Sequence, residues 1–358
     1  MAHAVTFVVM AGGRGERLWP LVRAHRPKVC VAPDGKTSLI ASTLKRLEGL
    51  SPKQGHLLVI TQSQAKAIAK ALPAKYHRAM VPEPQGKNTA ACIGLAASIL
   101  AHRDPEQVMV VLPADHWISP TSKFRDSLKA GIELSRAHDR MVMIGLPATR
   151  VHTGLGHLCT GQAQGTRHGC ATFRLVRFVE KPTPELAQEL MTQYRTFWNA
   201  GIFIGRVATF KALIRRWLPD HAARLDPLGP LAGTPRFARA LAAAYRPLQG
   251  ISFDHGVMAH VDDGFVVEGG FAWEDLGSWD SWVRMSAPHR KTCAIDSRNA
   301  RVVSFDGTQE HLIALIGLDD VIVVRTPDAT LICRADKAQA VRAAVTQLAA
   351  DRRLRTHL

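Results

Sequence analysis

The chain has 358 residues, of which 46% are hydrophobic and 21% are charged, so it is long enough to bury the core of one large domain or of two domains. No apolar run is long enough to cross a bilayer, and the short apolar N-terminal stretch lacks the basic lead-in and cleavage site of a signal peptide, so we expect a cytoplasmic protein without a membrane partner. The formal net charge is +16, but the basic residues are scattered, aromatic residues make up only 6%, and no RNA-binding or helix-turn-helix pattern is present, which argues against a nucleic-acid partner.

Strand-like and helix-like segments alternate through the first half of the chain. Short apolar runs predict strands at residues 4–10, 56–61, 78–81, 107–112 and 141–145. Between them, apolar residues spaced by three or four predict helices, as around 39–50 and 93–100. This alternation favours an α/β fold with a Rossmann-like, mostly parallel sheet and helices on both faces. Ligands of such sheets bind beyond the carboxyl ends of the strands.

The second half of the chain predicts a change of architecture. Residues 149–172 are rich in Gly, Thr and His and predict loops or an inserted hairpin, and residues 219–235 look like a helix connection. Strand-like segments follow at 173–179, 202–205, 300–305, 312–316, 321–326 and 330–333, and a final helix at 337–350. We therefore expect a first domain over residues 1–290 and a small β-rich C-terminal domain over residues 291–358 that ends in a helix.

The first expected strand opens into a loop of glycines and basic residues: Gly12, Gly13, Arg14, Gly15 and Arg17. Glycines let backbone N–H groups approach phosphate oxygens closely, and Arg17 together with the later Lys28 can neutralise phosphate charge. The loop is not a P-loop, because no Lys-Ser or Lys-Thr follows the glycines. It is not a dinucleotide fingerprint either, because Leu18 stands where the third glycine belongs. A tight turn explains the glycines alone, whereas a nucleotide-phosphate site explains the glycines and the cations.

Two carboxylates follow strand-like segments and suit a divalent cation. Asp115 follows the end of the strand expected at 107–112 by three positions, and Asp275 lies between Trp273 and Trp279. Carboxylate oxygens are the ligands that Mg²⁺ prefers, but either residue alone is explained equally well as a helix cap. The six cysteines, by contrast, have no metal-binding spacing and are expected to be reduced and mostly in the core.

Further polar segments suit a nucleotide and a sugar phosphate. Glu83 to Thr89 precedes a helix, where Asn88 or Thr89 could instead serve as a helix cap. Glu180 and Lys181 end a strand and could form a surface ion pair or bind a hydroxyl and a phosphate. Asn199 lies in a Trp-Asn-Ala-Gly segment that suits a sugar close to the backbone or an ordinary turn before a strand.

These segments occur in a set order that resembles the mannose-1-phosphate guanylyltransferases, a family of sugar-phosphate nucleotidyltransferases. The order is the glycine loop, Glu-Pro-x-Gly-Lys-Asn-Thr, Leu-Pro-Ala-Asp-His, Thr-Gly-x-Gly, Val-Glu-Lys-Pro, Trp-Asn-Ala-Gly and Trp-x-Asp-x-Gly-Ser-Trp. The resemblance covers about residues 5–282 and continues into the β-rich tail. No isomerase domain follows, so the short, single-activity form of the family is expected.

The resemblance implies roles for individual residues. Nucleotide-binding residues would be Gly12, Gly13, Arg14, Gly15, Glu83, Asn88 and Thr89. Those that bind the sugar phosphate would be Gly154, Gly156, Glu180, Lys181 and Asn199. The catalytic residues would be Arg17, Lys28, Asp115 and Lys181, and Asp115 and Asp275 would hold Mg²⁺.

The resemblance also implies the reaction. GMP would pass from GTP to mannose 1-phosphate by in-line displacement at the α-phosphorus, giving GDP-mannose and pyrophosphate. Val29 and Cys30 replace the family's Gln-Phe after the phosphate-binding lysine, and Leu155 and His157 replace two tyrosines, so another NTP or hexose 1-phosphate stays an alternative. A catalytically idle homologue that binds a nucleotide sugar is a second alternative, and a homodimer is a further expectation.

Overall fold

The computed structural model describes residues 4–50, 54–286, 289–305 and 311–358. Within these ranges nine strands form one sheet in the order β3-β2-β1-β4-β9-β6-β10-β8-β7. Their bounds are β1 Val5–Ala11, β2 Gln54–Thr61, β3 Met80–Glu83, β4 Val108–Pro113, β6 Met141–Pro147, β7 His157–Arg167, β8 Cys170–Val179, β9 Arg195–Arg206 and β10 Gly264–Glu268. The strands predicted from apolar runs are therefore confirmed, with ends that differ by a few residues.

The α/β class is confirmed, but the sheet is mixed, not mostly parallel. Strands β3, β2, β1 and β4 are parallel, whereas β9 runs antiparallel to both β4 and β6. The segment expected to hold loops or a hairpin forms the antiparallel β7–β8 hairpin. Its turn residues His168 and Gly169 both have positive φ, as a two-residue hairpin turn requires. An apolar run indicates that a strand is buried on both faces, but it carries no information about the strand's direction.

Helices cover both faces of the sheet, as the sequence predicts. On one face, Phe7 and Val110 pack in a core with α1 (Leu39–Leu47), α2 (Ala65–Ala71) and α4 (Thr121–Ala137). On the other, Val8 and Met109 pack with α3 (Asn88–Arg103), α6 (Val207–Trp217) and α9 (Phe253–Gly256). Side chains that alternate along β1 and β4 thus enter two separate cores. The remaining helices of this part are α5 Pro184–Gln193, α7 Pro219–Leu225, α8 Phe237–Tyr245 and α10 Trp279–Met285.

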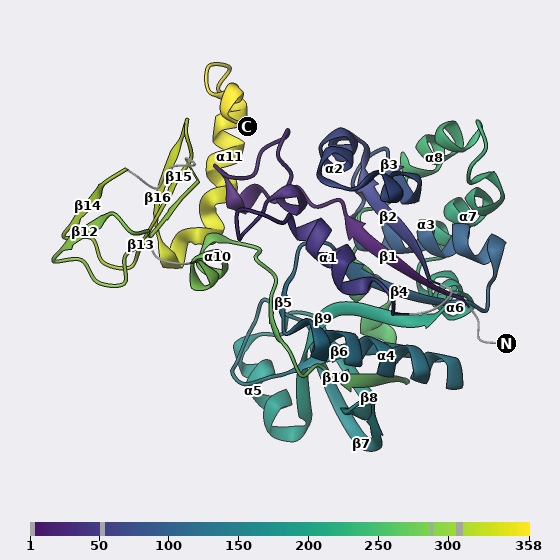
Figure 1. Cartoon of the computed structure of the whole chain (residues 1–358). Helices are drawn as coiled ribbons and strands as arrows, with labels where there is room; N and C mark the ends of the chain where they lie inside the picture. Colours follow the sequence, from purple (N-terminus) through teal and green to yellow (C-terminus); the bar gives the residue numbers. More distant parts are fainter. Residues whose placement is uncertain (1–3, 51–53, 287–288, 306–310) are drawn as a thin grey trace.

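The C-terminal segment forms small sheets and a helix, as expected. Strands β12 (Thr292–Ile295) and β14 (Ile313–Ile316) are parallel, and so are β13 (Arg301–Ser304) and β15 (Val321–Arg325), which also pairs with β16 (Thr330–Arg334). A short turn of 3₁₀ helix, η7 (Ala335–Ala340), leads into α11 (Val341–Ala350). Figure 1 shows α11 beside the purple loop that follows β1. The helix and this loop are thus close in space although they come from opposite ends of the sequence.

Buried apolar residues join this C-terminal segment to the glycine loop. Leu18 and Leu21 of the loop share one core cluster with Trp279, Val324 and Val341. The Trp19 indole also donates a hydrogen bond of 2.8 Å to the carbonyl of His357. The loop is therefore fixed by the last part of the chain as well as by the sheet.

All six cysteines are free thiols, as expected. Cys92, Cys159 and Cys170 are buried, but Cys293 is exposed on β12, so the expectation that the cysteines lie in the core holds only in part. Among the described residues, no helix is long and apolar enough to span a membrane.

Candidate active site

The glycine loop leaves the sheet at the carboxyl edge of its parallel half. Gly12 follows β1, and a Cβ at this position would lie 3.1 Å from Thr61 Oγ1 and 3.4 Å from Glu83 Oε2, at the ends of β2 and β3. The Thr61 hydroxyl donates to the Gly12 carbonyl at 3.0 Å, and the Gln64 amide donates to the Gly13 carbonyl at 3.3 Å. Only a residue without a side chain fits this close approach at Gly12 without displacing its neighbours.

Gly15 turns the loop back toward Lys28. Its φ is +65°, in the left-handed region, and a Cβ would lie 2.9 Å from the Lys28 Cβ. The 3₁₀ turn η1 (Glu16–Leu18) begins directly after it and carries the exposed Arg17. Arg17 Nη1 donates to Gln339 Oε1 at 2.7 Å, across 322 positions of the chain. Arg14 is exposed and lies 3.4 Å from Glu16.

Lys28 brings together the two predicted metal ligands. It is only 7% exposed, and its Nζ donates to Asp115 Oδ2 at 2.6 Å and to the Asp275 main-chain carbonyl at 2.7 Å. Burial by itself favours the neutral acid, but the Lys28 ammonium and the neighbouring His116 outweigh it and lower the pKa of Asp115 below its usual value. Asp115 is therefore an ionised carboxylate at neutral pH.

Strand pairing explains why two aspartates 160 positions apart meet. Strand β5 (Trp117–Ser119) begins two residues after Asp115, and β11 (Ala272–Glu274) ends directly before Asp275. The two strands are antiparallel, with Trp117 opposite Glu274, so both aspartates lie at the same end of this small ribbon. The Asp275 carboxylate accepts a hydrogen bond of 2.9 Å from the Gly277 N–H, which fixes its orientation.

His116 is a neighbour of this cluster and was not predicted as a site residue. It is buried, its Nδ1 accepts from the Trp273 indole at 3.1 Å, and burial lowers its pKa to about 4 despite the adjacent Asp115. The ring is therefore neutral at physiological pH. Its position next to Asp115 in the sequence was the available signal.

Glu83 lines a cavity of about 240 Å³ together with residues of the glycine loop and of α3. It is 4% exposed, its Oε1 accepts from the Tyr245 hydroxyl at 2.8 Å, and burial raises its pKa to about 7. Asn88, with φ +64°, and Thr89 line the same cavity. The Thr89 hydroxyl accepts from the Phe253 N–H at 2.8 Å, so this side chain holds the start of α9.

A second, larger cavity of about 1130 Å³ also borders the glycine loop. It collects cations from distant parts of the chain: Arg14, Arg17, Lys181 and Arg342. Gly12, Gly15, Gln85, Asn88 and Gln339 also line it. This chemistry suits an anion with several charges.

The expected sugar-side residues meet around Asn199, which is 7% exposed. Because β9 runs antiparallel, its first half lies at the same edge of the sheet as the glycine loop. The Asn199 N–H donates to the Gly156 carbonyl at 2.8 Å, and its side-chain amide donates to Asp254 Oδ1 at 2.8 Å. A Cβ on Gly156 would lie 2.8 Å from Glu180 Oε2, so the glycine makes room for that carboxylate.

Asp254 lies among these candidate sugar-side residues and was not predicted from the sequence. Burial and the nearby Glu180 carboxylate raise its pKa to about 6. Lys181, with φ +47°, pairs with Glu180 and lines the large cavity. Gly154 donates its N–H to His152 Nδ1 at 3.1 Å and lines neither of the two cavities beside the glycine loop.

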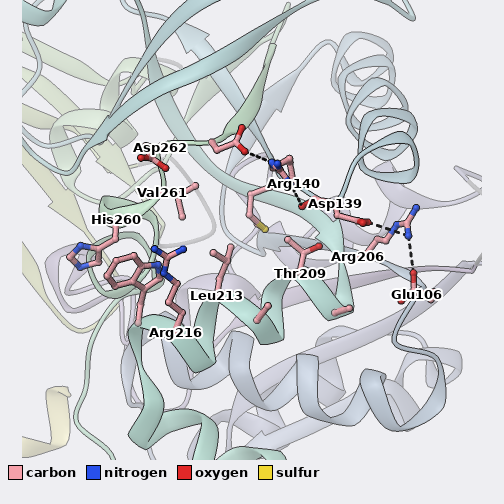
Figure 2. A pocket seen from close by; sticks show the side chains of 15 residues that line it. Glu106, Asp139, Arg140, Arg206, Thr209, Leu213, Arg216, His260, Val261 and Asp262 are labelled. Atoms are coloured by element: carbon pink, nitrogen blue, oxygen red, sulfur yellow. Dashed lines mark hydrogen bonds and ion pairs between the residues drawn. The ribbon is translucent and has the colours of Figure 1, made fainter.

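Another cavity, of about 610 Å³, lies elsewhere, at the amino ends of β6 and β10 (Figure 2). Two of its arginines are ion-paired, Arg206 with Glu106 and Asp139 and Arg140 with Asp263, and the third, Arg216, lies over the Trp217 ring. None of the predicted site residues lines it. The chemistry of the candidate site is therefore at the opposite, carboxyl edge of the sheet, where ligands of open α/β sheets bind.

Sequence comparison identifies the family. Residues 6–291 match the family model described as nucleotidyl transferase. A mannose-1-phosphate guanylyltransferase of Salmonella muenchen is 31% identical over 97% of this chain and 74% of its own length. One from Escherichia coli K12 is 30% identical over the same shares of the two chains. The chain belongs to the mannose-1-phosphate guanylyltransferase family of nucleotidyltransferases.

Solved structures agree with this family. A Thermus thermophilus protein described as a mannose-1-phosphate geranyltransferase is 31% identical, with a TM-score of 0.79 over 96% of this chain and 99% of that one. A UDP-glucose pyrophosphorylase from Acinetobacter baumannii, at 14% identity and a TM-score of 0.51, shares the fold over 79% of this chain and 92% of its own. Residues 291–348 match a model described as a mannose-phosphate isomerase/GMP-like beta-helix domain, in keeping with the parallel strand pairs β12–β14 and β13–β15.

The family uses a divalent metal, and the residues at Asp115 and Asp275 fit one. Each carboxylate has one oxygen already bonded, to Lys28 Nζ or to the Gly277 N–H, and a second oxygen to offer. Among the described residues, no group of three or more His, Cys, Asp or Glu side chains could hold a metal ion. Two carboxylates suit a hard cation that takes its other ligands from water and phosphate.

Proposed function

We propose that this protein transfers GMP from GTP to mannose 1-phosphate, giving GDP-mannose and pyrophosphate. The observation that carries the proposal is the cluster of Lys28, Asp115 and Asp275 beside a cavity lined by further cations. The relatives named mannose-1-phosphate guanylyltransferases, which align over 97% of the chain, support the choice of substrates.

In this reaction an oxygen of the sugar phosphate attacks the α-phosphorus of GTP. The bond between the α-phosphorus and the bridging oxygen breaks, and pyrophosphate leaves with that oxygen. No covalent intermediate on the protein is needed, so the protein contributes positioning and charge neutralisation. Lys28, held rigidly by two hydrogen bonds, is suited to bind a phosphate oxygen at the reacting centre. Arg17 is suited to the charge that develops on pyrophosphate.

We assign the cofactor as Mg²⁺, held by Asp115 and Asp275. When bound, it would supply Lewis-acid stabilisation of charge on the phosphate oxygens. Asp115 is ionised at neutral pH, as a metal ligand must be, because Lys28 and His116 lower its pKa.

The two substrates would lie on either side of this cluster. Gly12, Gly13, Arg14 and Gly15 would bind the GTP phosphates, and Glu83, Asn88 and Thr89 would lie near guanine and ribose. On the sugar side, Glu180 and Asn199 would form hydrogen bonds with hydroxyls, Lys181 would bind the sugar phosphate, and Gly154 and Gly156 would lie next to the sugar. The network of Asn199, Gly156 and Asp254 supports this side of the assignment.

The decisive experiment is a substrate panel. Pyrophosphate release is measured in Mg²⁺ for GTP, ATP, UTP, CTP and dTTP, each with mannose, glucose and galactose 1-phosphate. We expect kcat/KM to be highest for GTP with mannose 1-phosphate, by at least about tenfold. A higher value for another pair would identify a nucleotidyltransferase of different specificity. Binding of GDP-mannose with no turnover of any pair would identify an idle homologue.

Three further expectations stay proposals. A division of the chain near residue 290 is supported by the two family models, whose matches meet at residue 291. A cytoplasmic location and a homodimer suit a biosynthetic enzyme with small-molecule substrates. Gel filtration with light scattering tests the dimer, and limited proteolysis tests the domain division.

A further inference from the structure

The glycine loop meets the C-terminal segment, η7 and α11, through two polar contacts whose residues line the large cavity. Arg17 Nη1 donates to Gln339 Oε1 at 2.7 Å, and Arg342 Nε lies 3.2 Å from Glu16 Oε2. All four residues line the cavity of about 1130 Å³ together with Gly12, Gly15 and Lys181. The C-terminal segment therefore forms part of the wall in which the phosphates of the nucleotide would lie.

Buried neighbours fix both ends of the Arg17–Gln339 contact. Leu18, next to Arg17, is fully buried, and Ala338, next to Gln339, is 1% exposed. Both belong to one core cluster with Val341. The two backbones are thus held at a constant separation, whereas the guanidinium of Arg17 is itself exposed. An exposed arginine samples many rotamers, so a fixed acceptor restricts its direction.

Glu16 presents the opposite problem, because it is a carboxylate inside a cavity suited to anions. Two arginines neutralise it: Arg14 at 3.4 Å and Arg342 at 3.2 Å. Without Arg342, Glu16 would repel a triphosphate or compete with it for Arg17. The Arg342 side chain is 75% exposed, and such pairs contribute little to folding stability. The effect of this pair should therefore appear in nucleotide binding and not in stability.

We propose that the C-terminal segment formed by η7 and α11 completes the triphosphate site: Gln339, in η7, is a positioning residue for Arg17, and Arg342, in α11, neutralises Glu16. The proposal rests on the proposed function, since it assumes that a nucleoside triphosphate occupies this cavity. It extends that function by assigning a role to a segment that lies outside the nucleotidyl transferase match at residues 6–291.

A double-mutant cycle tests Gln339. GTP affinity is measured by calorimetry for the parent chain, Gln339→Ala, Arg17→Ala and the double variant, with Gln347→Ala, at an exposed position of the following helix α11, as control. We expect Gln339→Ala to weaken GTP binding about fivefold, the control to leave it unchanged, and Gln339→Ala to have no further effect once Arg17 is absent. Steady-state kinetics should show a higher KM for GTP and an unchanged KM for mannose 1-phosphate.

A suppressor experiment tests Arg342. We expect Arg342→Ala to raise the KM for GTP about fivefold, most strongly at low salt. The additional change Glu16→Gln should bring this KM most of the way back to the parent value. Arg352→Ala, an exposed arginine beyond the helix, is the matched control, and thermal unfolding of all variants should coincide with the parent.

The results separate the inference from the proposed function. The inference would be overturned, even in an active enzyme, if Gln339→Ala weakened GTP binding equally with and without Arg17. It would also be overturned if Glu16→Gln did not lower the KM for GTP of the Arg342→Ala variant. GTP binding by the parent chain without formation of GDP-mannose would contradict the proposed function alone, because both tests can be read from binding.

Discussion

Lys28 holds the two aspartates of the candidate site in one arrangement. Its ammonium contacts the Asp115 carboxylate at 2.6 Å and the Asp275 carbonyl at 2.7 Å, within a largely buried environment. Removing the charge of Lys28 or of Asp115 would leave the other side chain charged in a poorly solvated place without an opposite charge beside it. The chemistry of the site therefore depends on the pair and not on either charge alone.

We expect Asp115→Asn to lower turnover by at least about 100-fold, because a main electrostatic contact of the reacting centre is lost. Arg17→Ala should cause a loss of similar size, as expected for a cation that stabilises the departing pyrophosphate. Asp262→Asn, at an exposed carboxylate far from the glycine loop, is the control and should keep full activity. Turnover of Asp115→Asn within a few-fold of the parent would remove Asp115 from the reacting centre.

Glu83 should make stability depend on pH. Burial raises its pKa to about 7 from the usual 4.5, so the folded protein keeps a proton that the unfolded chain releases. The free energy of unfolding therefore falls as the pH rises from 4.5 to about 7 and is level above that range. Glu83→Gln removes this titration and keeps an acceptor for Tyr245, so it should stabilise the nucleotide-free protein at pH 8 by up to roughly 3 kcal/mol.

Urea unfolding at pH 4.5, 6 and 8 measures this effect. Glu189→Gln, on the exposed side of α5, should change stability by less than about 0.5 kcal/mol at every pH. A difference between Glu83→Gln and the parent that is the same at pH 4.5 and pH 8 would show that Glu83 titrates normally.

At the scale of elements, the glycines of the loop have unequal importance. Gly15 has positive φ and no room for a Cβ beside Lys28, whereas a Cβ on Gly13 would meet nothing within 4 Å. We expect Gly15→Ala to cost about 1–2 kcal/mol through backbone strain and to lower turnover by displacing Lys28. Gly13→Ala should leave stability nearly unchanged. Urea unfolding compares the two, and equal losses would mean that the loop does not need its left-handed turn.

Some strands could be predicted from the sequence and others only in part. Strands β1, β2 and β4 were predicted because both of their faces are buried, which produces continuous apolar runs. Strand β9 was predicted only from residue 202, because its first half carries Trp198 and Asn199 and resembles a turn. Asn199 is polar, and its side chain bonds to Asp254 in the candidate site instead of packing in an apolar core. The apolar pattern therefore fails where a strand carries a polar residue of the candidate site.

At the scale of the whole molecule, the site combines residues that local patterns cannot relate. Asp115 and Asp275 were expected to form a two-carboxylate metal site beside the phosphate loop, and the β5–β11 pairing provides the physical reason why they lie at the same end of one ribbon. Asp254 and Gln339 were missed, because each is joined to the candidate site only by a hydrogen bond to a residue far away in the chain, Asn199 or Arg17. Neither lies in a motif, so the sequence alone contains no signal for them.

The shared core of the glycine loop and the C-terminal helix predicts that the two lose structure together. Val341 is 3% exposed and packs in one cluster with Leu18 and Leu21. We expect Val341→Ala to cost about 2 kcal/mol and to raise hydrogen exchange in residues 16–22, while residues 5–11 in the central strand β1 keep their protection. Leu354→Ala is the control, because that side chain is 41% exposed.

Hydrogen exchange followed by mass spectrometry tests whether the C-terminal helix helps to hold the glycine loop in place. If exchange in residues 16–22 is the same in Val341→Ala and in the parent, the sheet alone holds the loop, and the C-terminal helix is only attached to it. Faster exchange in Val341→Ala, but not in Leu354→Ala, means that the order of the candidate phosphate site depends on a helix more than 300 positions away in the chain. A substitution far from any substrate would then weaken GTP binding through the loop, with Arg17 and Lys28 both intact.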